Sequence, residues 1–409
     1  MKKISLMIAL AMIAGTIAFS PITANAQEQD DKQVAFERDW YDACYVKKDT
    51  EKCYQLSKEM VEKNPSKNQQ YMDAAKRTIK NTELNKAWER FNAALNAFYK
   101  NPPQDAAKLE SVFAAGDDFL KVDSDPQSPF HLFVLGQMAI AGRIGVLGEI
   151  YKNLDRVKGY AERAIKAFES PVAPEKYKKE YSEYVLPLRD LVVANMNQYL
   201  GYYLIQTNGD QAQAIAYLTK ATQVKGKDGT GWKDPNNYNL RASIYSKQYE
   251  SLRKKYDALP DDQKTADAGK EILKQVNELL DTKLIPDYAR VIATATTPES
   301  KEMKTGATEL FNSFWKFRVD DPTKAPAFLK AFEADPTVEG PAVPAKAETT
   351  DLNAPAAPVG SSTGAKMTTG TTSTPPGTGS AKNSSNGSKS SSKPTSTKSK
   401  PKNTRRKPR

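Results

Sequence analysis

The chain has 409 residues, with 60 Lys and Arg against 49 Asp and Glu, one histidine and two cysteines. So few cysteines and histidines nearly exclude a Cys/His metal centre, and any histidine-based triad or zinc site would have to use His131. Roughly 300 residues between 30 and 335 carry nearly all the aromatic and aliphatic side chains, which is enough for a sizeable core.

The first 26 residues have the pattern of a secretory signal peptide. Lys2 and Lys3 precede an apolar run over 4–19, and an Ala-x-Ala site follows at 24–26. We expect cleavage there, which gives a mature chain that starts near Gln27, with no lipid anchor and no further transmembrane segment. The alternative is an uncleaved membrane anchor, for which the apolar run is short. The pattern therefore predicts a bacterial protein of the cell envelope, periplasmic or secreted.

The body of the chain, at 27–335, has helical periodicity throughout and no sustained alternation of apolar and polar residues. This pattern predicts an all-α fold. Pro187 and Pro286 fall inside apolar runs, and each predicts either a kink or a break in a helix. The predicted helices cover 68–80, 84–100, 105–122, 130–144, 157–169, 188–206, 210–224, 239–259, 269–295 and 300–319.

One stretch of the body, 198–222, has a small residue between large apolar ones on each of two predicted helices. Gly201 lies between Leu200 and Leu204, and Ala214 precedes Leu218 and Ala221, with a turn at 208–210 between the two sets. The stretch resembles one tetratricopeptide (TPR) helical hairpin. The resemblance implies a TPR-like α-solenoid of antiparallel helical hairpins, in which such repeats bind partners and rarely catalyse reactions. The alternative is an irregular helical bundle.

The two cysteines, Cys44 and Cys53, flank a predicted turn at 47–50 between two helices. Neighbouring helices in a tight hairpin bring Cα atoms within the range of about 5–6 Å that a disulfide needs, and an oxidising compartment lets the bond persist. We expect a disulfide that stabilises the fold by about 2–3 kcal/mol. The alternative is two buried free thiols in the small-residue positions of the hairpin.

Tyrosines recur at helical spacing in the second half of the body. In a repeat protein some of them would line a groove and hold a peptide with an apolar ring and a polar tip. The alternative is packing between helices. The residues that we expect in a partner-binding groove are Tyr199, Tyr202, Tyr203, Tyr238 and Tyr245.

We expect no catalytic residue, metal ion or cofactor. His131 stands at the start of an apolar helix, where it reads as a helix-start or packing residue. Carboxylate pairs such as Asp117-Asp118 and Asp261-Asp262 occur at expected helix ends and turns, where Asp caps helices. The glycine-rich stretch at 225–232 follows no strand, so it predicts a flexible loop between repeats, without phosphate binding.

The last segment, 336–409, is rich in Ser, Thr, Pro and Lys and predicts a disordered tail. Eleven Lys and Arg lie after the last acidic residue, Asp351, and without them the chain has 49 basic and 49 acidic side chains. A basic tail outside the cytoplasm would meet anionic lipid or acidic polysaccharide, and nucleic acid is not expected there. The alternative is a solubilising spacer. The expected polyanion contacts are Lys398, Lys400, Lys402, Arg405, Arg406, Lys407 and Arg409.

These features predict an exported, non-enzymatic helical-repeat scaffold. Its body would bind a protein or peptide partner, and its tail would tether it to anionic components of the envelope. One alternative is an envelope structural protein that acts through its polycationic tail. Another is a polysaccharide-acting enzyme on a helical scaffold, which would need two facing carboxylates in a cleft.

Overall fold

The computed structural model describes residues 31–63, 65–100, 104–169, 173–319 and 321–346. The signal peptide predicted at 1–26 lies outside these residues. So do the basic tail residues Lys398, Lys400, Lys402, Arg405, Arg406, Lys407 and Arg409.

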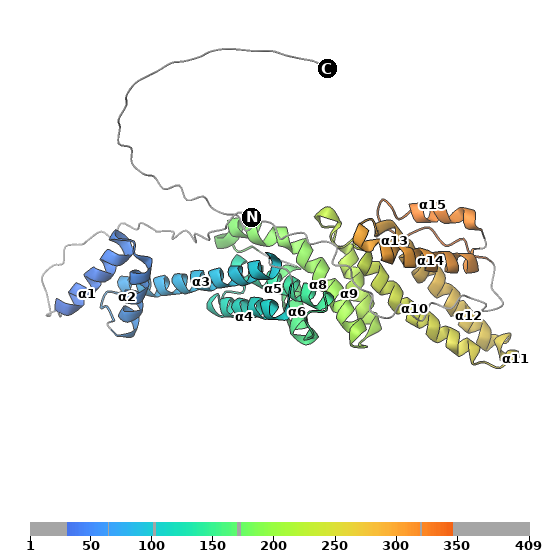
Figure 1. Cartoon of the computed structure of the whole chain (residues 1–409), viewed down its shortest axis with the longest axis horizontal. Coiled ribbons are helices and arrows are strands. Elements are labelled where there is room, and N and C mark those ends of the chain that lie inside the picture. The colour runs from blue at the N-terminus through green and yellow to red at the C-terminus, as the bar shows by residue number, and fades with distance from the viewer. Residues whose placement is uncertain (1–30, 64, 101–103, 170–172, 320, 347–409) are drawn as a thin grey trace, which may run out of the picture. The chain divides into compact units, whose positions relative to one another are not determined.

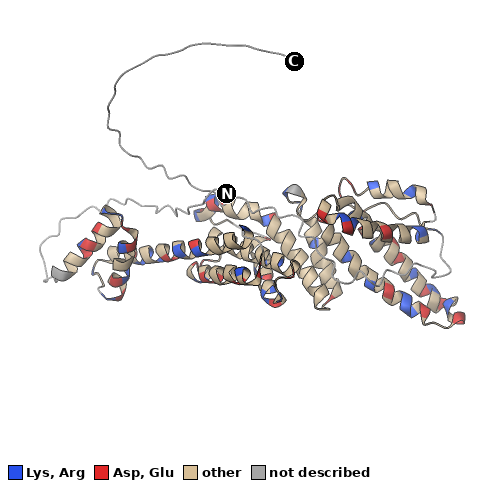
Figure 2. Cartoon of the chain, in the orientation of Figure 1, with Lys and Arg blue, Asp and Glu red and all other residues tan. Residues whose placement is uncertain are grey.

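The described chain is all-α, as the periodicity predicts (Figure 1). Besides helices, these residues form one isolated β-bridge, between Lys225 and Gly231. Acidic and basic side chains are interspersed along the helices (Figure 2). The first helices are α1 (Asp31–Tyr41), α2 (Thr50–Glu62), α3 (Gln69–Lys100), α4 (Ala106–Val122), α5 (Pro129–Leu147) and α6 (Leu154–Phe168). They are followed by α7 (Lys178–Glu180), α8 (Leu186–Gln206), α9 (Gln211–Gln223), α10 (Pro235–Asp257), α11 (Asp261–Lys264), α12 (Asp267–Leu279), α13 (Ile285–Thr294), α14 (Lys301–Arg318) and α15 (Ala325–Lys330).

Shorter helical turns join these elements. The π-helical turns are η1 (Asp42–Val46), η3 (Tyr181–Val185) and η5 (Leu280–Leu284), and the 3-10 turns are η2 (Glu175–Tyr177), η4 (Lys227–Gly229), η6 (Pro298–Ser300) and η7 (Pro322–Lys324). Most predicted helices are present within a few residues of their expected bounds. The two helices expected at 68–80 and 84–100 are one helix, α3, because the residues between them include no glycine or proline to end it.

Pro187 and Pro286 neither break their helices nor end them. Each lies in the first turn of an α-helix that directly continues a π-helical turn, in which the bonds run from residue i to i−5. The N–H of Leu186 donates to the carbonyl of Tyr181, and that of Ile285 donates to Leu280. A proline has no N–H and its ring crowds the carbonyl four residues earlier. In both cases that carbonyl belongs to the π turn, whose wider winding lets the helix continue.

α5 is the one helix, among the described residues, that is long and apolar enough to cross a membrane, and the sequence analysis did not single it out. Of its most apolar window, 78% is buried inside the protein. The helix contacts α4, α6 and α8. This environment is that of a core helix, which passes the same test of length and hydropathy.

α8 and α9 form a closely packed hairpin, and the stretch that resembles a TPR unit lies in it. A Cβ atom added to Gly201 would lie 2.6 Å from Cγ of Leu218, so only glycine allows this approach of the two helices. The turn places Asn208 at a positive φ of 51°, and the Asp210 carboxylate caps α9 by accepting from the N–H of Ala212. The small residue predicted at the helix contact is therefore where the helices meet.

The chain after α15 packs on the helical body, so the tail predicted to start at 336 starts too early. Pro336 is buried, and Val343 packs against the core cluster that includes α13 and α14. Arg290 on α13 donates to the carbonyls of Pro336 (2.8 Å) and Val338 (3.1 Å), and the N–H of Lys346 donates to Arg318 (2.8 Å). The composition of residues 336–346 did not predict this packing, because the contacts are made largely by backbone carbonyls. We call 331–346 the C-terminal segment.

Arg290 is itself held by a buried carboxylate, that of Asp287, which is 2% exposed. Asp287 accepts from Arg241 on α10 (2.5 and 3.0 Å) and from Arg290 (3.0 Å). One buried charge thus joins α10, α13 and, through Arg290, the C-terminal segment. The three charged side chains stabilise the fold only together, because a single charge left unpaired in the core lowers the stability.

Replacing Asp287 with Ala leaves two partly buried guanidinium groups without their carboxylate. We expect the free energy of unfolding to fall by about 3–5 kcal/mol, measured by urea denaturation. The control is Asp257→Ala, since Asp257 makes only an exposed 3.8 Å ion pair with Arg253 and should change stability by less than about 0.5 kcal/mol. Equal losses in the two variants would contradict the role of Asp287.

Candidate functional site

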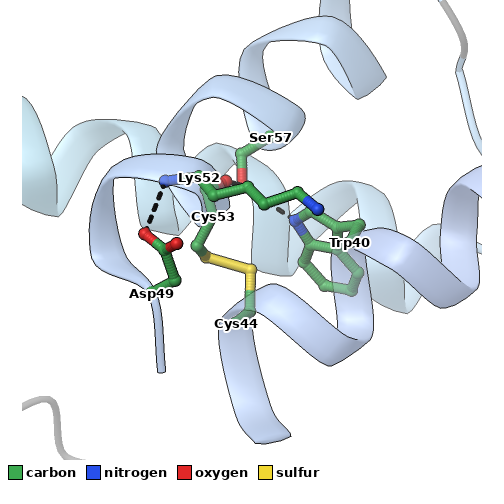
Figure 3. The surroundings of a disulfide bond; sticks show 6 residues. All are labelled: Trp40, Cys44, Asp49, Lys52, Cys53 and Ser57. Carbon is green, nitrogen blue, oxygen red and sulfur yellow. Dashed lines mark hydrogen bonds between the residues drawn. A yellow bond between two sulfur atoms is a disulfide. The ribbon is translucent and has the colours of Figure 1, made fainter. Parts of the chain in front are cut away.

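Cys44 and Cys53 form a disulfide that closes the first helical hairpin, with their Cα atoms 4.8 Å apart (Figure 3). Cys44 lies in the π turn η1 and Cys53 in the first turn of α2. The turn between them is fixed by Asp49, whose carboxylate accepts from the N–H of Lys52 (3.0 Å). The predicted disulfide is therefore present, and the alternative of two free thiols is wrong.

Trp40 anchors this hairpin from inside. Its ring is fully buried, and its indole N–H donates to the Ser57 hydroxyl (2.8 Å), which in turn donates to the carbonyl of Cys53 (2.7 Å) (Figure 3). The buried polar groups are therefore satisfied within the hairpin. The disulfide thus joins η1 to α2, and this chain of hydrogen bonds joins α1 to α2.

The outer side of α1 and η1 exposes large apolar and aromatic side chains. Val34 is 37%, Tyr45 39% and Val46 62% exposed. Tyr41 lies between them at helical spacing, with its ring 5.1 Å from that of Tyr45. We call Val34, Tyr41, Tyr45 and Val46 the tyrosine face. Exposed apolar groups close together on one hairpin are typical of binding surfaces, and tyrosine is enriched in them.

Cations border the tyrosine face. Lys47 and Lys48 follow Val46 directly and are exposed. Arg77 on α3 is close enough to lower the pKa of Tyr45, although burial of the ring outweighs it and the pKa is raised overall. Tyr45 thus lies near positive charge, with one carboxylate, that of Asp42, between the two tyrosines in the chain.

The predicted groove tyrosines do not form a groove, and for Tyr199 and Tyr238 the prediction is wrong. Their rings are 0% and 1% exposed, and burial raises the pKa of both. The Tyr199 hydroxyl donates to the carbonyl of Leu154 (2.9 Å), and that of Tyr238 donates to Trp232 (2.7 Å). They are core residues with satisfied polar tips, the packing alternative that the sequence left open.

The other three predicted tyrosines are partly exposed but engaged within the fold. Tyr202 packs against the cluster shared by α9 and α10, and Tyr245 packs against the cluster of α10, α12, α13 and α14. The Tyr203 hydroxyl donates to the carboxylate of Asp155 (2.6 Å). The structure therefore does not bring the five side chains together on one surface.

A pocket of about 290 Å³ lies elsewhere, beside the glycine-rich loop at 225–234. It is bounded by α8, this loop, the start of α10, the turn between α13 and α14, and the C-terminal segment. Gly229 and Gly231 both have positive φ. Asn237 donates to the carbonyl of Gly231 (2.9 Å), so the loop predicted to be flexible is tied to α10.

His131 and the carboxylate pairs make structural contacts. His131 donates from Nδ1 to the carbonyl of Asp123 (2.7 Å) at the start of α5. Asp117 accepts from Tyr160 (2.8 Å), and Asp261 pairs with Lys264 (2.9 Å). Within the described ranges, His, Cys, Asp and Glu side chains form no group of three or more that could hold a metal ion.

No family model, curated protein or solved structure matches this chain. The resemblance to a TPR protein therefore rests on sequence motifs, of which the α8–α9 hairpin is the main one. The candidate site likewise rests on its own geometry.

Sequence reasoning missed the tyrosine face because it looked for tyrosines where they are most frequent. The available signal was the helical spacing of Val34, Tyr41 and Tyr45, next to a predicted disulfide. By itself such a stripe predicts a side that is buried against another helix, so the sequence alone did not indicate its exposure.

Replacing both cysteines with alanine should lower the free energy of unfolding by about 2–3 kcal/mol, because the cross-link restricts the unfolded chain. Urea denaturation with and without a reductant measures this. The reductant should lower the stability of the wild type to that of Cys44→Ala/Cys53→Ala and leave the variant unchanged. Maleimide labelling of the unreduced wild type should find no thiol, and labelling of both cysteines would contradict the disulfide.

Proposed function

We propose that the protein is an exported, non-enzymatic scaffold of TPR-like helical hairpins that binds a protein partner through the tyrosine face. The proposal is carried by one observation, the exposed stripe of Val34, Tyr45 and Val46 on a hairpin closed by a disulfide. A disulfide in a two-cysteine protein supports an oxidising compartment, in agreement with the export signal. A rigid surface loses little conformational freedom on binding, which favours affinity.

The occupant of the tyrosine face is an apolar segment of another protein, flanked by acidic residues. The chain's own tail is poor in large apolar side chains, and residues 27–30 are Gln-Glu-Gln-Asp, so neither suits this surface. A second copy would bring Lys47, Lys48 and Arg77 against the same charges of its mate, which is unfavourable. Acidic flanks on a different protein would match these cations.

A photo-crosslinking amino acid at position 46, in cells that export the protein, tests the proposal. We expect an adduct with another protein, and mass spectrometry should place the cross-link in an apolar segment with acidic neighbours. Tyr45→Asp should abolish the adduct because it puts a charge into the apolar contact.

The control carries the same amino acid at position 338, which is also exposed but lies in the C-terminal segment. The same adduct from both positions, or adduct formation that survives Tyr45→Asp, would overturn the proposal. A product at twice the mass of the chain would show self-association instead.

The basic tail is proposed to tether the protein to an anionic surface, since lysines near such a surface contribute about 1 kcal/mol each at physiological salt. Mature protein should sediment with phosphatidylglycerol vesicles at low salt and be released at high salt. A variant that ends at Lys346 keeps the packed C-terminal segment and should not bind. Phosphatidylcholine vesicles are the control, and equal binding by both proteins would contradict the tether.

The tail also carries a second candidate function, that of an envelope structural protein. All of the formal net charge of +11 comes from the eleven basic residues after Asp351, which favours this reading. If the variant ending at Lys346 still forms the cross-link at position 46, the body binds its partner without the tail. Loss of that cross-link on truncation would favour the structural alternative.

A further inference from the structure

Hydrogen bonds within the protein hold the groups that surround the pocket beside the glycine-rich loop. Gln198 on α8 donates to the Asp234 carboxylate (2.7 Å) and to Asn237 (2.9 Å), both at the start of α10. Gln198 in turn accepts from the guanidinium of Arg143 on α5. The wall formed by Asp234 is thus held by two other helices.

The opposite wall is held by an ion pair. Lys225 in the loop contacts Asp335 of the C-terminal segment at 2.7 Å, and this contact is the main reason that the pKa of Asp335 falls to about 2. Glu333 and Pro336, on either side of Asp335, line the pocket. The segment that Asp287 and Arg290 hold in place therefore completes the site.

Neutral polar side chains and apolar groups both line the pocket. Amides come from Asn195 and Asn236, and hydroxyls come from the turn between α13 and α14. The side chains of Asn195, Thr230 and Thr296 make no hydrogen bond with the described residues, so they are available to a ligand. An amide both donates and accepts, as a sugar hydroxyl does.

The side-chain charges at the pocket disfavour an anionic ligand. Asp234 and Glu333 contribute two carboxylates against one ammonium, that of Lys233. A carboxylate accepts strong hydrogen bonds from hydroxyl groups. Leu191, Pro235 and Pro336 supply a small apolar surface, suited to the C–H groups of a ring.

We propose that this pocket binds one neutral sugar unit, free or at the end of a glycan. A volume of about 290 Å³ is at the small end for ligand pockets, which fits one ring and its substituents. Carboxylate and amide groups bind the hydroxyls, and the two prolines contact the ring. This site is separate from the tyrosine face, so neither proposal depends on the other.

Saturation-transfer NMR on the mature protein tests the proposal with glucose, galactose, mannose and N-acetylglucosamine, each at about 10 mM, since single sugars bind with millimolar Kd. We expect at least one sugar to bind. Asn195→Leu should weaken it at least about tenfold, because it removes an amide and fills the pocket with apolar atoms. Asn239→Leu, on α10 outside the lining, is the matched control and should not change binding.

Glu333→Gln is the second variant, because Glu333 is exposed and its replacement leaves the fold intact. It should weaken the sugar several-fold through the loss of a charged acceptor. Thermal unfolding of each variant at the wild-type temperature shows that binding, and not folding, has changed. Binding of none of the four sugars, or binding unaffected by Asn195→Leu, overturns the proposal. So does displacement of the sugar by tetraglycine, which would make the pocket a peptide site.

Discussion

The buried carboxylate of Asp287 organises the C-terminal half of the described chain. It lies between guanidinium groups from α10 and α13, and the second of these, Arg290, also holds two backbone carbonyls of the C-terminal segment. Removing three charges from water costs free energy, and the hydrogen bonds among them offset this cost only when all are present. The C-terminal segment, and with it one wall of the pocket, therefore depends on a single buried charge.

The N-terminal hairpin differs from this region, because it is too small to bury all its apolar side chains. Trp40 and Met60 are fully buried in its core, whereas Val46 and Tyr45 remain exposed. Exposed apolar surface favours association, and a covalent cross-link keeps the hairpin folded while the surface stays open. In this account the disulfide contributes stability to the hairpin, and the rings of the tyrosine face are the proposed binding surface.

Periodicity was sufficient to predict the helical class and the positions of most helices, because apolar side chains at helical spacing must face a core. The spacing of Cys44 and Cys53 across a turn likewise indicated the disulfide. Gly201 could be placed at a helix contact because only a residue without a side chain fits there. These constraints act between residues that are near one another in the chain, so they can be predicted from a single sequence.

Several of the misses depend on how distant parts of the chain pack together. Tyr199 and Tyr238 have the same local spacing as exposed tyrosines, and only the packing of other helices around their rings makes them core residues. The composition of the C-terminal segment predicts a disordered tail. Arg290 binds backbone carbonyls of the segment, and such contacts do not depend on its side chains. The pocket could not be predicted either, since its walls come from segments over a hundred residues apart, from Leu191 to Pro336.

A scan of single photo-crosslinking substitutions along α1 and η1 tests the central claim most directly. The account predicts adducts with the same partner at positions 34, 41, 45 and 46, which lie on the tyrosine face. It predicts none at positions 35 and 39, which are also exposed but lie off this face. Adducts at all six positions, or at none, would contradict a helical binding surface on this hairpin.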